Sequence, residues 1–359
     1  MHLAQLRLRD FRNYARLDVA FTPGFHLLLG NNAQGKTNLL EAIYLLATLR
    51  SFRGVGSAQL VRHGQRGYFV GAKVISQGEH EIKMYWSAAE RKLSLNQQPV
   101  RRFSDYLGVC RAVVFCTEDL QLVKGPAARR RRFIDLLLSQ THRTYLPLLQ
   151  RYTQALRSRN ALLKKIPRDP AALEGFTAEL ISNGNQLIEF RHDLLPKIAP
   201  IVQHAYERIA GQKETLRLIY QPAVHSDFAV ELAQSRGREQ TLRSTVIGPH
   251  RDELQLLLND RAAAQFGSEG QKRSIAIALK MAQAEYLNQL HGTPPILLID
   301  DIMGELDLHR RSAFLPLLEQ VHQGRSQVFM TATEENWPRE LAAHSIRWEV
   351  KSGMLHKMP

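Results

Sequence analysis

The stretch Gly30-Asn31-Asn32-Ala33-Gln34-Gly35-Lys36-Thr37 fits the pattern G-x-x-x-x-G-K-[ST] in full. It follows a short apolar run, Phe25–Leu29, that suits a buried strand, and it precedes helical periodicity as far as about Leu49. A strand-to-helix turn of this composition wraps backbone N–H groups around phosphates. Lys36 is then placed to reach the β- and γ-phosphates, and the Thr37 hydroxyl to bind Mg²⁺. The stretch therefore predicts a nucleotide-binding loop (P-loop) in an α/β fold.

A second motif, Ile296-Leu297-Leu298-Ile299-Asp300-Asp301, places two carboxylates directly after four apolar residues. The apolar residues predict a buried strand, and α/β sheets bind ligands at the carboxyl ends of such strands. Asp300 is expected to hold the Mg²⁺ shell, and Asp301 to orient or deprotonate the attacking water. Many apolar strands end in Asp, so this motif gains its weight from the P-loop upstream.

The third motif, Gly267-Ser268-Glu269-Gly270-Gln271, opens a predicted helix that runs to about Leu290. Ser268 is suited to cap this helix, and Gly270 permits a close backbone approach. The N-terminus of such a helix is a candidate anion site. Because the chain already has a P-loop for its own nucleotide, we expect this site to meet the γ-phosphate of a nucleotide held by another copy.

Charge and composition narrow the class of protein. The chain has 359 residues with a formal net charge of +14, and 44% of its residues are hydrophobic. These values indicate one large or two globular domains rather than a disordered chain. Residues 101–170 hold 15 basic and 5 acidic side chains. This local excess favours a polyanion-binding face, although a solubilising surface would show the same count.

Membrane and disulfide-rich classes are disfavoured. No apolar run approaches the roughly 18–20 residues that span a bilayer, and the N-terminus lacks a signal-peptide core. Cys110 and Cys116 are too few for a disulfide framework or a four-ligand zinc site. We therefore expect buried thiols in a cytoplasmic protein.

Hydrophobic periodicity divides the chain into three parts. Residues 1–125 and 241–359 alternate strands with helices and are expected to form one head domain, whereas residues 126–240 read as a helical insertion. Beyond the first three strands, further strands are expected at Tyr68–Ile75, Ile82–Trp86, Lys92–Leu95, Val109–Phe115, Thr215–Tyr220, Thr241–Ile247, Leu254–Leu258, Ile296–Ile299, Gln327–Thr331 and Ile346–Val350.

The insertion is expected to consist of two long antiparallel helices. Helical spacing runs from Arg129 to Lys165 and again from Leu180 to Ile209. Pro196 and Pro200 are expected to kink or split the second helix, because proline removes a backbone donor inside a helix.

The order P-loop, long gap, Ser-x-Gly-Gln signature and apolar-Asp-Asp resembles the ABC-type ATPase heads of the SMC-related group. Gly35 and Ser268 are 233 residues apart, which leaves room for a helical insertion. Further segments point to the RecF family within that group: Leu8–Asn13, Asn38–Tyr44, Ser51–Gly54, Phe115–Leu120, Arg131–Asp135, Gly248–Leu254 and Asp300–Asp307. The resemblance implies a mixed sheet with flanking helices and a helical insertion domain.

The resemblance also implies roles for single residues. Arg12 and Asn13, on the turn before the P-loop strand, would touch ATP together with Asn38; a plain polar turn is the alternative for the first two. Glu118 would belong to a loop that senses the metal and the water. The catalytic set comprises Lys36, Asp301, Ser268, Gly270 and Gln271, and the switch and dimer loop comprises Asp307, Thr331 and Thr333.

Four positions depart from the pattern of that group. Glu269 stands in the signature where Gln is expected, and its charge near the γ-phosphate would slow hydrolysis or weaken dimer closure. Gly304 stands where Ser is more usual. Thr331 and Thr333 stand where other ABC ATPases place a switch His, so the γ-phosphate would be sensed through a hydroxyl.

A basic cluster lies in the predicted insertion. Its members are Arg129, Arg130, Arg131, Arg132, Arg157, Arg159, Lys164 and Lys165. Four arginines in the first turns of a helix oppose the helix dipole, which favours an anionic partner. Few aromatic residues are interleaved, so contact with DNA phosphates is expected rather than base stacking. A solvated helix face is the alternative.

The function implied by the resemblance is ATP-dependent DNA binding in recombinational repair and replication-fork restart. ATP would join two copies into a homodimer that clamps DNA at gaps, single strands or junctions, and slow, DNA-dependent hydrolysis would release it. RecR and RecO are the partners that the resemblance implies. The alternatives are the ATPase subunit of an ABC transporter, a metabolic P-loop kinase, and a non-hydrolysing SMC-like scaffold.

Overall fold

The computed structural model describes residues 1–165, 169–211, 213–306, 310–312, 314, 327–333 and 345–358. The chain folds into two compact units. The first comprises Met1–Asp119, Ala205–Gly211 and Arg273–Pro359, and the second comprises Leu120–His204 and Gln212–Lys272. Residues 241–272, which were expected in the head domain, group with the second unit.

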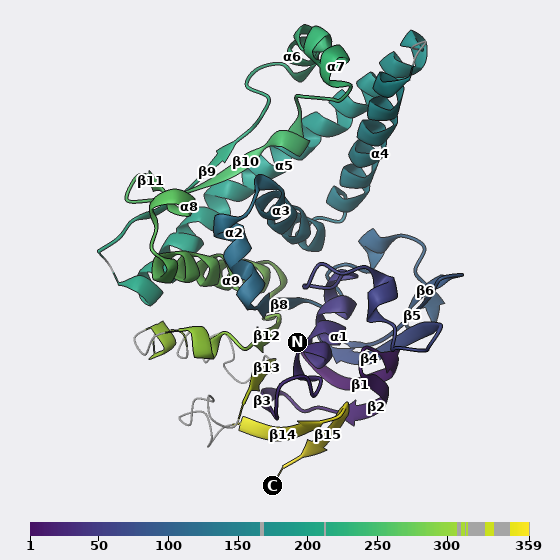
Figure 1. The fold of residues 1–359 in the computed structure, drawn as a ribbon, viewed down its shortest axis with the longest axis vertical. Helices are drawn as coiled ribbons and strands as arrows, with labels where there is room; N and C mark the ends of the chain where they lie inside the picture. The colour runs from purple at the N-terminus through teal and green to yellow at the C-terminus, as the bar shows by residue number, and fades with distance from the viewer. Residues whose placement is uncertain are drawn as a thin grey trace. The chain divides into compact units, whose positions relative to one another are not determined.

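The first unit contains two six-stranded sheets. The central sheet has the order β15-β14-β3-β13-β12-β8, parallel from β14 to β8, with β15 antiparallel at its edge (Figure 1). The other sheet is antiparallel, in the order β2-β1-β4-β5-β6-β7. The strands are β1 His2–Phe11, β2 Tyr14–Ala20, β3 Gly24–Leu29, β4 Gly67–Ile75, β5 Glu79–Ser87, β6 Arg91–Leu95, β7 Gln98–Pro99, β8 Ala112–Phe115, β12 Ile296–Asp300, β13 Gln327–Ala332, β14 Ser345–Lys351 and β15 Met354–Lys357.

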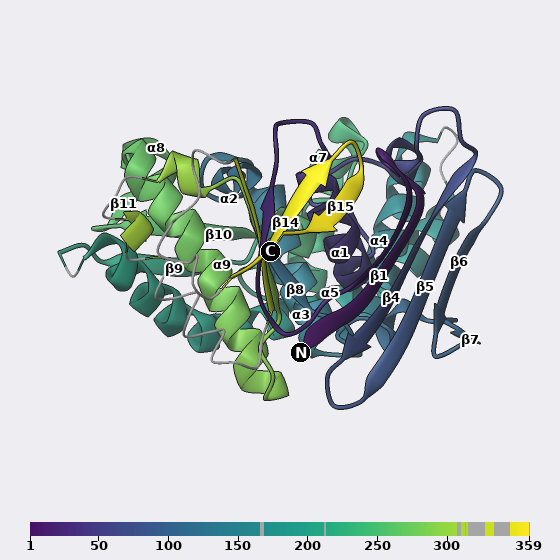
Figure 2. The same ribbon diagram turned by 90° about the horizontal axis from the view of Figure 1, so that it is seen from below.

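Helix α1 (Lys36–Thr48) lies between these two sheets, as Figure 2 shows. Every residue from Leu39 to Thr48 is buried, as expected of a helix that is covered on all sides. The parallel strands β8, β12 and β13 are almost wholly buried and apolar, whereas β1 alternates buried and half-buried residues. Both patterns follow from whether one or two faces of a sheet are covered.

The second unit is mainly helical, with a three-stranded antiparallel sheet in the order β11-β10-β9. Its elements are α2 Gln121–Lys124, α3 Ala127–Thr141, α4 Tyr145–Lys164, β9 Leu216–Gln221, α6 Phe228–Gln234, α7 Arg236–Leu242, β10 Glu253–Leu258, β11 Arg261–Ala262 and α8 Ala263–Phe266. Helices α5 (Pro170–Ala210) and α9 (Glu269–His291) supply residues to both units. Within the described residues, no helix is both long and apolar enough to cross a membrane.

One prediction about the helices was wrong. The segment 129–165 is not one helix, because α3 ends at Thr141 and α4 begins at Tyr145. Pro147 explains the break: it fits the first turn of a new helix but would lose a backbone hydrogen bond inside a continuous one. Pro196 and Pro200 lie inside α5 and do not split it, and the kink stays a prediction.

The expected strand at 241–247 was also wrong. Arg243 has a positive φ of 51° and caps α7, a conformation that a strand does not contain. The Thr245 N–H donates to the Asn160 side chain at 2.7 Å instead of pairing with a strand. Side-chain hydrogen bonding of this kind competes with sheet formation and is invisible to periodicity.

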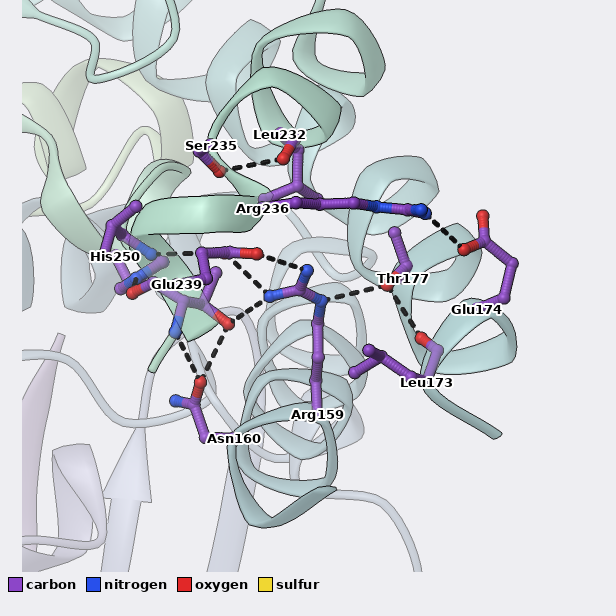
Figure 3. Close-up of polar contacts among 12 residues, drawn as sticks. Arg159, Asn160, Leu173, Glu174, Thr177, Leu232, Ser235, Arg236, Glu239 and His250 are labelled. Carbon is purple, nitrogen blue, oxygen red and sulfur yellow. Dashed lines mark hydrogen bonds and ion pairs between the residues drawn. The ribbon is translucent and has the colours of Figure 1, made fainter. Parts of the chain in front are cut away.

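A buried ion pair joins three helices of the second unit. Both terminal nitrogens of Arg159 on α4 bind the Glu239 carboxylate on α7, at 2.8 and 2.7 Å, and both side chains are at most 2% exposed. The Arg159 Nε donates to Thr177 on α5, and Nη1 also donates to Thr245 (Figure 3). Because each charge is paired inside the protein, this network links the three helices and does not form part of a binding surface.

Replacing Arg159 by Ala should lower the free energy of unfolding of the second unit by about 3 to 5 kcal/mol, because Glu239 would remain buried without its partner. Urea unfolding followed by circular dichroism measures this. The matched control is Arg157→Ala on the same helix, where the side chain is exposed and the change should stay within about 0.5 kcal/mol. Equal losses in the two variants would contradict the assignment.

Candidate nucleotide site

The P-loop lines a cavity of about 320 Å³ in the first unit. It opens where β3, β12 and β13 reach their carboxyl ends, the place where parallel sheets bind ligands. Besides Asn31–Asn38, the cavity is lined by Arg53, Asp301, Thr331 and Thr333. The P-loop, Asp301 and the switch residues Thr331 and Thr333 are thus brought together, although Thr37 and Thr331 lie 294 residues apart in the chain.

Glycines are required at both ends of the loop. Gly30 has φ +149°, and a Cβ there would come within 2.4 Å of the Val350 carbonyl oxygen. Gly35 has φ +118°, and a Cβ there would meet the Asn13 side chain at 2.7 Å. Close approach of the Val350 backbone therefore requires glycine at position 30, and the positive φ together with the Asn13 side chain favours it at position 35.

Lys36 begins α1 and folds back over the loop. Its Nζ donates to the carbonyl oxygens of Gly30 at 2.5 Å and Asn31 at 2.9 Å. Burial lowers the pKa of Lys36, while the negative charges of Asp301 and Asp300 act in the opposite direction. The ammonium is thus held at the mouth of the loop, where phosphate oxygens could replace these carbonyls as acceptors.

Asp300 joins three elements. Its Oδ1 accepts hydrogen bonds from the hydroxyls of Thr37 at 2.8 Å and Thr331 at 3.0 Å. The Thr331 oxygen also accepts the Asp301 N–H at 3.0 Å, and Asp301 itself adopts a positive φ of 54°. Burial raises the pKa of Asp300, and the bonds from Thr37 and Thr331 oppose that rise. A hydroxyl and a carboxylate at this distance form the start of a divalent-cation site.

The protein supplies few ligands for such a cation. Among the described residues, no three Asp, Glu, His or Cys side chains are grouped to hold a metal. Mg²⁺ commonly takes one or two protein oxygens and completes its shell with phosphates and water. Thr37 and Asp300 fit that requirement.

Arg53 is a site residue that the sequence analysis missed. It lines the cavity, its Nη1 lies 3.4 Å from Asn38 Oδ1, and its charge acts to lower the pKa of Asp300. The Ser51 Oγ, which accepts the Arg53 N–H, holds the start of this loop. In the sequence, Ser51–Gly54 was only one of the segments that carry the family resemblance. A basic residue soon after a P-loop could have indicated a further phosphate contact.

Arg12 and Asn13 do not line the cavity. Arg12 donates to both carboxylate oxygens of the buried Glu41 on α1, at 2.8 and 3.0 Å. Asn13 donates to the Gln34 carbonyl oxygen at 2.8 Å and accepts from Asn38 at 2.8 Å. Arg12 thus supports helix α1, and Asn13 supports the P-loop and the start of that helix. Direct contact of either side chain with a nucleotide stays a prediction.

Glu118 and the switch residues are placed unequally. Glu118 is exposed on the turn Thr117–Leu120 after β8, near enough for its charge to raise the pKa of Asp300. Thr331 is buried at the end of β13, and Thr333 lines the cavity. Asp307 lies outside the described residues.

The signature residues belong to the second unit. The Ser268 N–H donates to Gln271 Oε1 at 2.7 Å, and the Gln271 N–H donates to Ser268 Oγ at 3.2 Å. This reciprocal capping box fixes the N-terminus of α9. Glu269, the residue that departs from the expected signature, forms an ion pair with Lys124 at 2.5 Å.

The predicted basic cluster divides by burial. Arg129, Arg132, Arg157, Lys164 and Lys165 are exposed. Arg159 is buried in the network of Figure 3, so its prediction as a DNA contact is not supported by its position. Arg130 and Arg131 turn inward, Arg130 onto Glu253 through two bonds of 2.7 Å and Arg131 onto the Asp252 carbonyl.

These contacts also explain the unfavourable run of arginines at the start of α3. Four cations against the helix dipole favoured an external anion as their partner. For Arg130 the anion is internal, because Glu253 on β10 supplies it. The two cysteines are buried thiols, as expected.

Comparison with known proteins places this architecture in a family. Residues 2–346 match the family described as the RecF/RecN/SMC N terminal domain. The chain is 40% identical to the DNA replication and repair protein RecF of Synechococcus sp. (strain JA-2-3B'a(2-13)), covering 93% of this chain and 91% of that protein. It is 36% identical to the protein of the same name from Lactococcus lactis subsp. cremoris (strain MG1363), covering 99% of each.

Solved structures agree with this match. The recombination mediator protein RecF-ATPrS in the RecFOR pathway superimposes with a TM-score of 0.90 at 30% identity, covering 100% of this chain and 98% of that one. The Smc head domain from Pyrococcus furiosus superimposes with a TM-score of 0.58 at 16% identity, over 99% and 96%, and shows the fold alone. The α/β fold of an ABC-type ATPase head is thus confirmed, and the transporter and kinase alternatives are set aside.

Proposed function

This chain belongs to the RecF family of DNA replication and repair proteins, and we propose that it binds DNA under the control of ATP. The work it serves is recombinational repair and replication-fork restart in the cytoplasm. The observation that carries the proposal is the cavity in which a complete P-loop meets Asp300, Asp301 and Thr331. A solved relative carries the name RecF-ATP, which supports ATP as the nucleotide.

ATP binding would use the residues that already line or brace the loop. Backbone N–H groups of the P-loop would cradle the phosphates, and Lys36 would exchange its carbonyl acceptors for phosphate oxygens. Thr37 and Asp300 would hold Mg²⁺, which neutralises charge that develops during phosphoryl transfer. Arg53 would add a second cation to the phosphate side of the cavity.

Hydrolysis would be slow. Asp301 lines the cavity at the end of β12 and is placed to orient the attacking water. The Thr331 hydroxyl, at the position of a switch residue, already binds both Asp300 and the Asp301 N–H. A hydroxyl held in this way fixes the Asp300 carboxylate and the Asp301 backbone but moves no proton, which suits a timer rather than a motor.

A second copy would complete the site. Ser268, Gly270 and Gln271 lie at the N-terminus of α9, whose dipole attracts anions. We propose that this end meets the γ-phosphate held by the partner's P-loop, so that two ATP molecules join a homodimer. The long signature spacing and the match to RecF proteins favour this arrangement over a non-hydrolysing scaffold.

Replacing Asp301 by Asn should leave ATP binding intact but let the dimer accumulate, because water is no longer activated. Light scattering with ATP measures the dimer lifetime, and a fluorescent ATP analogue checks binding. Equal dimer lifetimes for the two proteins would refute the role of Asp301.

DNA would contact the exposed cations of the second unit. Helix α4 contains no acidic residue, and Arg157 and Lys164 are exposed seven residues apart, which is two turns along one face. Phosphate contacts of this kind are tolerant of sequence and sensitive to salt. The DNA would be gapped, single-stranded or a junction. The RecFOR pathway named for the solved relative supports RecO and RecR as partners.

The double variant Arg157→Ala, Lys164→Ala should weaken DNA binding about tenfold for every sequence tested and flatten the salt dependence of log Kd by about 2. Fluorescence anisotropy across a salt series, with and without ATP, measures both. The matched control is Arg236→Ala, since Glu174 already pairs with that exposed arginine at 2.6 Å. Loss of affinity without a change in slope would mean that these residues do not touch phosphates.

The ion pair between Glu269 and Lys124 would compensate the unusual signature. A lone carboxylate beside the γ-phosphate repels it, whereas Lys124 at 2.5 Å cancels that charge. Lys272, at 3.9 Å from Glu269, adds to the effect. Glu269 would therefore slow dimer closure less than its charge alone suggests.

Replacing Lys124 by Gln should weaken ATP-driven dimerisation about tenfold, because only the more distant Lys272 then offsets the charge of Glu269 near the phosphate. Adding Glu269→Gln should restore the wild-type dimer affinity. Sedimentation with ATP, at equal nucleotide occupancy, measures both. A double variant as weak as Lys124→Gln would show that Lys124 acts by another route.

A further inference from the structure

The turn between β14 and β15 binds the P-loop, and we infer that it positions the loop for phosphate binding. The Ser352 N–H donates to Gln34 Oε1 at 2.7 Å, and the Gly353 N–H donates to the Gln34 carbonyl oxygen at 3.0 Å. All these atoms lie in the first unit. The inference rests on the proposed ATP binding and assigns a role in it to residues outside the nucleotide motifs.

Strand pairing brings the turn to this place. β14 runs parallel to β3, with Glu349 opposite Leu29. Because β3 leads directly into Gly30, the residues that follow Glu349 must run beside the start of the loop. The Val350 carbonyl lies so close that a Cβ on Gly30 would come within 2.4 Å of its oxygen. The hairpin and the loop are therefore fitted to each other along their length.

Two donors hold the Gln34 carbonyl. Besides the Gly353 N–H, the Asn13 Nδ2 donates to it at 2.8 Å. The donors come from separate turns, β1–β2 and β14–β15, that are themselves packed together: a Cβ on Gly353 would lie 2.6 Å from the Asn13 carbonyl oxygen. The Gln34 carbonyl is thus fixed against rotation.

Fixing this carbonyl also fixes a phosphate-binding donor. In a trans peptide the C=O and the next N–H lie in one plane and point in opposite directions. With the Gln34 oxygen held toward Asn13 and Gly353, the Gly35 N–H must point away from them, on the side of the cavity that Gly35 lines. The hairpin turn therefore prevents a peptide flip that would remove one N–H from the phosphate cradle.

Glycine substitutions test the contact. Gly353→Ala adds a Cβ that must push the Asn13 backbone away from Gln34, whereas Gly292→Ala places the same strained residue (φ +64° against +74°) in open space. Gly353→Ala should weaken ATP binding about tenfold, the loss of one hydrogen bond to a charged group, and Gly292→Ala should leave it within about twofold. Titration with a fluorescent ATP analogue measures affinity. The melting temperature without nucleotide should fall in both variants because of the positive φ, and further in Gly353→Ala because of the contact with the Asn13 backbone.

A second measurement uses the unaltered protein. If the turn holds the loop for phosphate, ATP must in turn stabilise the turn, because coupling between two sites is reciprocal. Hydrogen exchange at Ser352 and Gly353 should slow when ATP binds. Equal affinities of Gly353→Ala and Gly292→Ala, or unchanged exchange on adding ATP, would overturn the inference. A wild-type protein that binds no ATP would refute the proposed function instead.

Discussion

The shared hydrogen bonds of Asp300 are the constraint on which the first unit depends. One carboxylate oxygen binds the hydroxyls of Thr37 at the start of α1 and Thr331 at the end of β13, while Asp300 itself ends β12. Two parallel strands and the P-loop helix thus meet at one partly buried carboxylate oxygen. A carboxylate in that position is stable only while hydrogen-bond donors or a cation surround it. The contacts that would prepare Asp300 to bind a cation are therefore also the contacts that hold β12, β13 and α1 together.

The sequence predicted the head far better than the insertion, for physical reasons. Strands such as β12 and β13 are buried on both faces and read as apolar runs, and Gly35, Lys36 and Thr37 are dictated by phosphate chemistry. The break between α3 and α4 depends on one proline, and residues 241–247 are held by side-chain bonds such as Asn160 to Thr245. Neither changes the hydrophobic period, which is what sequence analysis detects.

The count of charged residues was an equally incomplete guide to their roles. The excess of basic residues was visible in the sequence, but burial divides it into different tasks. Arg159 forms a buried ion pair with Glu239, and Arg130 forms an ion pair with Glu253. Arg157 is exposed to solvent. A count of cations therefore overstates the surface available to a polyanion, because arginine is also the residue best suited to tie buried carboxylates together. Residues of one kind in one helix had to be separated by their contacts.

The strand order of the central sheet has a consequence for synthesis of the chain. β3, which leads into the P-loop, pairs on its two sides with β13 and β14, whose residues are made some 300 positions later. At about 5 to 20 residues per second, β3 waits roughly 15 to 60 s for its neighbours. Most of the second unit, by contrast, is complete before then. During translation the nucleotide-binding strand is thus an unpaired apolar edge, and the protein's exposure to aggregation is greatest before its last hairpin emerges.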